Sequence, residues 1–184
     1  MRPRHAPLPR LLLITDERLG DALWPALAAL PRGAGIVFRD YGLAGPARRA
    51  RYDRVRAIAR RRALILILAA APRQAAAWRA DGCHGPLPHR TARPLLRSAG
   101  AHDRAALIGA RRRGADLILV SPLFATRSHP GAPALGPCRA AAIAGCDRSD
   151  LVALGGMTRA RARRLAGFGI QRWAAIDGLT PDGP

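Results

Sequence analysis

The chain has 184 residues and a formal net charge of +19, and its 31 basic residues are all arginines. Apolar residues make up 49% of the chain, which is typical of a globular protein and argues against extended disorder. The arginine excess points to nucleic acid or an anionic membrane as a partner, but only 4% of the residues are aromatic, which disfavours a base-stacking platform. We therefore disfavour nucleic acid as the ligand and assign most arginines to solvated helix faces.

The start of the chain is basic, but its apolar run extends only from Leu11 to Ile14. A signal peptide needs about 7–15 apolar residues and a membrane-spanning helix about 20, so we predict neither. The three cysteines, Cys83, Cys138 and Cys146, are odd in number and widely spaced, which predicts neither a disulfide framework nor a zinc site. We expect a cytoplasmic protein without a membrane partner.

Short apolar runs alternate with Ala/Arg-rich amphipathic segments. The runs predict strands at 11–15, 35–38, 63–69, 115–120 and 151–154, with a weaker one at 173–176. The intervening segments predict helices at 17–31, 44–62, 73–80, 103–113, 137–145 and 158–168. Continuous apolar strands that alternate with helices predict a parallel sheet that is covered on both faces.

Two further strands, at 82–84 and 95–100, would bring the number of strands to eight. At roughly 23 residues per unit, the chain would form a short (β/α)8 TIM barrel in one domain over residues 1–184. A doubly wound open sheet is the competing architecture, but no Gly-rich dinucleotide fingerprint follows the first strand.

The segment "LVALGGMTRARARRL" (151–165) is a candidate phosphate seat. Gly155 and Gly156 let an anion approach the backbone, and Thr158 can cap the helix that begins directly afterwards. In a parallel barrel, phosphate commonly binds beside the last two strands. The alternative is that the two glycines only make a tight turn.

The loop in "VSPLFATRSHPGAPALG" (120–136) is longer than a usual strand-to-helix connection of about two to six residues. Thr126 and Ser128 can donate hydroxyl hydrogen bonds, while Arg127 and His129 offer positive charge to a phosphate or pyrophosphate. We favour an anion-binding loop over a proline-stiffened lid.

Three further residues are weaker candidates. Arg39 follows the second strand and either faces the barrel mouth or pairs with Asp40. His84 and His102 are each better interpreted as satisfied structural histidines. The sequence shows no close pair of carboxylates and no dense His/Asp/Glu cluster of the kind that holds a metal ion.

In order, the segments "LLLITD" (11–16), "FRD" (38–40), "ADGCH" (80–84), "GADLILVSPLFATRSHPGAPALG" (114–136) and "VALGGM" (152–157) resemble the thiamine-phosphate synthase/TenI family. The resemblance covers roughly residues 11–179 and implies a (β/α)8 barrel. It also implies a transferase that joins a hydroxymethylpyrimidine diphosphate to a thiazole phosphate, expelling pyrophosphate with the help of magnesium. By carry-over, Gly155 and Gly156 form the phosphate seat, Thr126 and Ser128 are the loop hydroxyls, and Arg39 is the arginine after the second strand.

The chain departs from the family at the metal. Ala69 and Ala70 fall at the family's Asn-Asp after the third strand, and the family's Gly-Gln-Glu-Asp segment is shortened to residues 85–88. Magnesium needs oxygen-rich anionic ligands, so we predict no metal site and an impaired synthase reaction. His129 also replaces the loop lysine of the family.

The TenI branch of the family offers an alternative function. It includes thiazole tautomerases, which use a general acid/base, but the histidine of that branch corresponds to Pro122 here. His102 or His129 would have to substitute for it. A catalytically silent paralogue that binds a phosphorylated ligand is equally open. Because the chain ends soon after the eighth strand, we expect the last covering helix to be missing or supplied by a partner subunit in a homo-oligomer.

Overall fold

The structure, a computed structural model, describes residues 8–86, 94–126, 131 and 133–180. Eight parallel strands form a closed barrel in chain order, with β8 paired to β1. The strands are β1 (Leu11–Ile14), β2 (Gly35–Phe38), β3 (Ile65–Ala69), β4 (Gly82–His84), β5 (Leu96–Ala101), β6 (Leu117–Val120), β7 (Leu151–Ala153) and β8 (Arg172–Ala175). The predicted (β/α)8 barrel is confirmed, and the competing open sheet is wrong.

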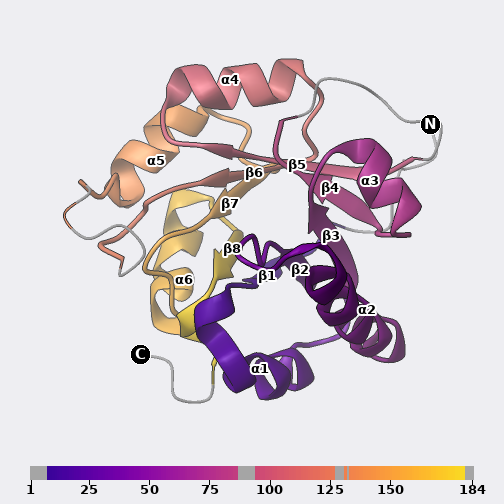
Figure 1. Cartoon of the computed structure of the whole chain (residues 1–184). Coiled ribbons are helices and arrows are strands. Elements are labelled where there is room, and N and C mark those ends of the chain that lie inside the picture. Colours follow the sequence, from indigo (N-terminus) through magenta and orange to yellow (C-terminus); the bar gives the residue numbers. More distant parts are fainter. Residues whose placement is uncertain (1–7, 87–93, 127–130, 132, 181–184) are drawn as a thin grey trace.

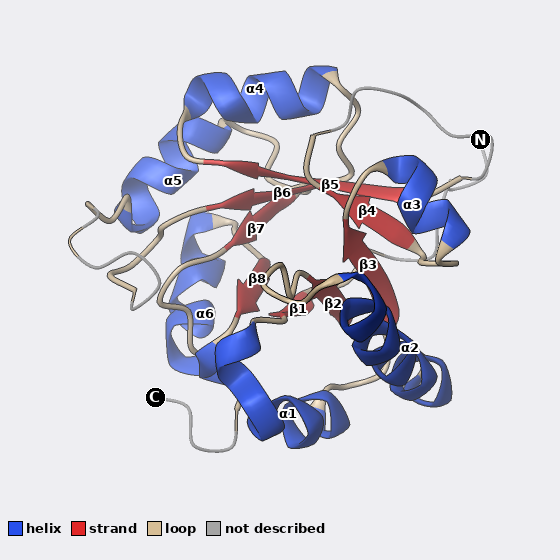
Figure 2. Ribbon diagram, viewed as in Figure 1, coloured by secondary structure: helices blue, strands red, loops and turns tan. Residues whose placement is uncertain are grey.

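Helices surround the strands (Figure 1), and the blue helices of Figure 2 lie outside the red barrel. The α-helices are α1 (Leu23–Ala29), α2 (Gly45–Arg62), α3 (Pro72–Ala77), α4 (Arg104–Arg112), α5 (Gly136–Ala144) and α6 (Arg159–Leu165). The 3-10 helices are η1 (Glu17–Ala22), η2 (Ala166–Phe168) and η3 (Asp177–Leu179). Up to residue 180, η3 is the one helical element that the structure describes after β8.

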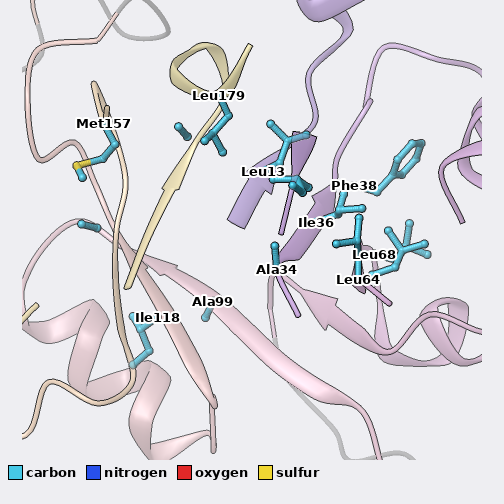
Figure 3. Packing of buried hydrophobic residues seen from close by; sticks show 14 of the residues in the cluster. Leu13, Ala34, Ile36, Phe38, Leu64, Leu68, Ala99, Ile118, Met157 and Leu179 are labelled. Carbon is cyan, nitrogen blue, oxygen red and sulfur yellow. The ribbon is translucent and has the colours of Figure 1, made fainter. Parts of the chain in front are cut away.

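The strand side chains form two separate cores. Leu12 and Ile14 of β1 pack with Val37 of β2 inside the barrel. Leu13 and Ile36, one position along the same strands, belong to the outer core that the strands share with the helices. Part of this outer core is shown in Figure 3. Because both faces of β2, β6 and β7 are buried, these strands are apolar without interruption, and this is why the sequence shows continuous runs there.

Side chains cap the starts of η1 and α6, and the sequence predicted the cap at Thr158. The Asp16 carboxylate accepts a hydrogen bond from the Arg18 amide at the start of η1, and the Thr158 hydroxyl accepts one from the Arg161 amide at the start of α6. Gly114 has a positive φ of 74° directly after α4, as expected of a glycine that ends a helix.

Arginines occur on five helices around the barrel, α2 to α6, so the positive charge is not confined to one face. Several have structural partners. Arg54 lies over the Trp24 ring at 3.7 Å, and Arg111 holds the Asp150 carboxylate at 2.7 Å. Within the described ranges, none of the helices combines the length and apolar character needed to cross a membrane.

Candidate functional site

A cavity of about 1420 Å³ lies at the carboxyl ends of the strands. Residues at or after the ends of seven strands, all except β3, contribute to its described lining. Ile14, Val37 and Leu119, which also belong to the core inside the barrel, give it an apolar wall. Catalytic and binding residues of (β/α)8 barrels come from this end of the barrel, so the cavity is the candidate site.

The loops that follow β6 and β7 are hydrogen-bonded to each other at the cavity. The Leu123 amide donates to the Leu154 carbonyl at 2.8 Å, and the Phe124 amide donates to the Gly155 carbonyl at 3.1 Å. The two segments that the sequence singled out, 120–136 and 151–165, therefore meet, and Thr126, Gly155 and Gly156 line the same cavity.

Gly155 and Gly156 are required by this close approach. Their φ angles are 93° and 60°, which side chains rarely adopt. A Cβ on Gly155 would lie 2.8 Å from the Pro122 Cα, and a Cβ on Gly156 would overlap the Ala125 carbonyl oxygen. Neither glycine amide donates a hydrogen bond to another residue in the described part of the chain. The glycines thus both join the two loops and leave backbone donors at the cavity.

Three arginines from α5 and α6 line the cavity beside these loops: Arg139, Arg161 and Arg164. Arg161 is half-buried, its guanidinium lies 4.7 Å from the centre of the Phe124 ring, and it donates to the Gly156 carbonyl. Arg139 and Arg164 are exposed at the rim. None of the three was predicted as a site residue from the sequence, because arginines on an amphipathic helix resemble solvated residues. The available signal was the i, i+3 spacing of Arg161 and Arg164 directly after the glycine pair.

Arg39 faces the cavity from the end of β2, as one of the two sequence-based alternatives predicted. Its guanidinium donates to the Asp16 carboxylate at 3.2 Å. The other alternative, a pair with Asp40, is wrong. Asp40 is fully buried, pairs with Arg51 at 2.7 Å and accepts a hydrogen bond from the Thr15 hydroxyl at 2.6 Å.

His84 lies at the end of β4 and lines the cavity. The buried Ser98 hydroxyl donates to the Cys83 carbonyl at 3.2 Å, so it accepts a hydrogen bond from His84 Nδ1–H at 3.0 Å. Burial, and then the positive charge of Arg39, lower the pKa of His84 to about 4. The ring is therefore neutral near pH 7, and its Nε2 atom is a hydrogen-bond acceptor. The predicted structural role of His84 explains the hydrogen bond of Nδ1 but assigns no role to Nε2.

His102 also lines the cavity, with Nδ1 2.7 Å from the Ser121 carbonyl oxygen to which it donates. Arg127, Ser128 and His129, the other candidates from the loop, lie outside the described residues.

A sequence model of the thiamine monophosphate synthase family matches residues 11–179, nearly the whole chain. The chain belongs to the thiamine monophosphate synthase family. A comparison with curated proteins finds no match.

Solved structures show the same barrel. The thiamine phosphate pyrophosphorylase from Pyrococcus furiosus is 22% identical with a TM-score of 0.76, over 96% of this chain and 90% of that chain. The thiamine phosphate pyrophosphorylase from Bacteroides thetaiotaomicron is 20% identical with a TM-score of 0.56, over 91% and 82%. The YdjI aldolase from Escherichia coli K12 is 12% identical with a TM-score of 0.59, over 91% and 75%. At these identities the likeness establishes the fold alone.

The described residues do not fit the magnesium site that membership of the thiamine monophosphate synthase family implies. Ala69 ends β3 and Ala70 follows it, while Gly85 and Pro86 follow β4, and none of these side chains carries an oxygen ligand. Residues 87–88 lie outside the described ranges. Across those ranges, no group of three or more His, Cys, Asp and Glu side chains is placed to hold a metal ion.

Proposed function

We propose that this chain joins a hydroxymethylpyrimidine diphosphate to a thiazole phosphate and releases pyrophosphate. The observation that carries the proposal is one cavity with cationic groups on two sides. The glycine turn and Arg161 lie at β7, and Arg39 lies at β2, three strands away around the closed barrel. A site for two phosphorylated substrates needs such separated positions, with an uncharged space between them.

The thiazole phosphate would bind at the paired loops. The free amides of Gly155 and Gly156 and the Arg161 guanidinium are donors for phosphate oxygens, and charge-assisted bonds of this kind are roughly twice as strong as neutral ones. Thr126 lines the cavity next to them. This arrangement would hold the thiazole ring toward the centre of the barrel.

The pyrimidine diphosphate would bind with its diphosphate near Arg39. The thiazole ring nitrogen attacks the methylene carbon that carries the diphosphate. A C–N bond forms, the C–O bond breaks, and pyrophosphate leaves with the bonding electrons. Arg39 would stabilise the negative charge of the leaving group, because a positioned cation lowers the energy of such a transition state. Ile14, Val37 and Leu119 would give the reacting carbon an apolar surrounding.

The test has two parts. Thiazole phosphate binding is measured by calorimetry, and thiamine phosphate formation is measured by chromatography with both substrates and magnesium chloride present. We expect one thiazole phosphate per chain and product formation above the uncatalysed rate. Binding without product would identify a silent paralogue, and no binding would show that the proposal is wrong. Arg164→Gln is expected to weaken thiazole phosphate binding, and Arg163→Gln is the matched control, because it removes the same charge from the same helix outside the cavity.

A thiazole tautomerase is the second candidate, favoured by the two histidines at the cavity. His84 and His102 both use Nδ1 for a protein hydrogen bond, so Nε2 of each is available for proton transfer. NMR spectra of a thiazole phosphate tautomer with the wild-type chain and with His102→Gln would test this. Conversion that the variant loses would favour the tautomerase, and no conversion would reject it.

The three cysteines are free, and Cys138 and Cys146 are exposed. Exposed free thiols suit a reducing compartment, so the proposal places the reaction in the cytoplasm.

A further inference from the structure

Cations dominate the charged groups that face the cavity. Of its described lining residues, Arg39, Arg139, Arg161 and Arg164 are arginines, whereas Asp177 is the one carboxylate. The planar guanidinium group offers paired donors that match two phosphate oxygens, and it stays charged at every physiological pH. The positive charge of the cavity therefore comes from the arginine side chains of the protein itself.

A further cation lies where magnesium ligands would be needed. Ala69 at the end of β3 pairs in register with His84 at the end of β4, so these strand ends are neighbours. Arg48 reaches this edge from α2 and donates to the carbonyl oxygens of Arg39 at 2.9 Å and of Ala69 at 3.0 Å. A guanidinium group at this edge would repel a magnesium ion through Coulomb repulsion.

Asp16 and Asp40, two of the carboxylates near the ends of β1 and β2, already have arginine partners. Asp16 accepts hydrogen bonds from Arg18 at 2.7 Å and from Arg39 at 3.2 Å, and Asp40 is buried against Arg51 at 2.7 Å. The pKa of Asp16 is lowered, chiefly by the hydrogen bond from Arg18. These acids serve to hold arginines, so their charge is not available to attract a metal ion.

We propose that guanidinium groups replace magnesium as the counter-charge for pyrophosphate in this cavity, so that the chain binds pyrophosphate without a divalent cation. This inference rests on the proposed function and specifies how the leaving group is stabilised. Arg39 would contact the pyrophosphate directly, and Asp16 would hold its guanidinium in place. The departing pyrophosphate then meets a positive charge that is already in place and does not have to bind from solution first.

The experiment titrates pyrophosphate into the full chain by calorimetry at about 0.15 M salt, where charges on the exposed surface are largely screened. One titration contains EDTA and the other contains magnesium chloride. We expect one pyrophosphate per chain in EDTA, with an affinity that magnesium leaves unchanged or weakens. Binding that requires magnesium, or that magnesium tightens by about tenfold or more, would overturn the inference.

Variants separate the cavity from the general positive charge of the chain. Arg39→Gln is expected to weaken pyrophosphate binding in EDTA by about tenfold or more, as expected for loss of a charged pair. Arg163→Gln, which removes the same charge outside the cavity, is the control and is expected to leave pyrophosphate binding unchanged. Equal binding by the two variants, or several pyrophosphates per chain, would show that the ion is adventitious and contradict the inference.

Thiazole phosphate distinguishes this inference from the proposed function. If thiazole phosphate binds in EDTA but pyrophosphate binds only with magnesium, the guanidinium inference fails and the proposed function stands. If neither ligand binds with or without magnesium, both are wrong.

Discussion

Replacing Gly155 with alanine tests whether the two cavity loops are joined as described. Gly155 has φ of 93°, and a residue with a side chain in the left-handed region costs about 1–2 kcal/mol. Its Cβ would lie 2.8 Å from the Pro122 Cα, whereas carbon atoms pack well at about 3.5–4.0 Å, so the loops must separate by about 1 Å. That movement strains the hydrogen bonds of the Leu123 and Phe124 amides, each worth about 1 kcal/mol.

The expected loss for Gly155→Ala is therefore about 2–4 kcal/mol in the free energy of unfolding, measured by urea denaturation. Gly33→Ala is the matched control, because Gly33 also has a positive φ, 77°, but nothing lies within 4 Å of its Cβ position. It should lose only the conformational part, about 1–2 kcal/mol. Thiazole phosphate binding should fall in Gly155→Ala and stay unchanged in the control. Equal destabilisation and equal binding in the two variants would refute the loop geometry.

Two further predictions concern the buried ionisable groups of His84 and Asp40. His84 has an ordinary pKa of 6.5 and a folded-state pKa of about 4, so between these values the unfolded chain binds the additional proton. The free energy of unfolding should fall by about 3 kcal/mol as the pH is lowered through this window. Denaturation curves of His84→Gln should lack this part of the pH dependence. A His84 imidazole that titrates near pH 6.5 in NMR spectra would contradict the prediction. Asp40→Ala should lower the free energy of unfolding by about 2–3 kcal/mol, because it leaves Arg51 without its buried carboxylate. Asp53→Ala, which removes a half-exposed pair with Arg49, should lower it far less. Denaturation that gives the same loss for both aspartates would show that the Asp40 pair contributes little.

The barrel could be predicted from the sequence because most strands are buried on both faces. Leu12 and Leu13 point to opposite cores, and both cores are apolar, so the strand stands out as an unbroken run. β4 is short, and β5 contains Arg97 and Ser98, so neither gives such a run and both were reached only by completing the count of eight strands. β3 begins two residues later than predicted, because Ala63 adopts a left-handed conformation and ends α2.

The candidate site could be predicted only where local backbone chemistry determines it. A glycine pair followed by Thr158 indicates a turn and a capped helix, and the structure has both. The partner of Asp40 could not be predicted, because Arg51 approaches it from α2 after a turn that no local pattern describes. The neutral state of His84 likewise depends on its burial and on the positive charge of Arg39, which arise only once the barrel has closed.

Thiamine phosphate formation by the wild-type chain with both substrates, in EDTA and in magnesium chloride, tests the proposed chemistry most directly. We expect product in EDTA at a rate that magnesium does not raise by more than about tenfold, and loss of that rate in Arg39→Gln. Product only with magnesium would contradict the guanidinium role, and no product in either buffer would contradict the proposed synthase function.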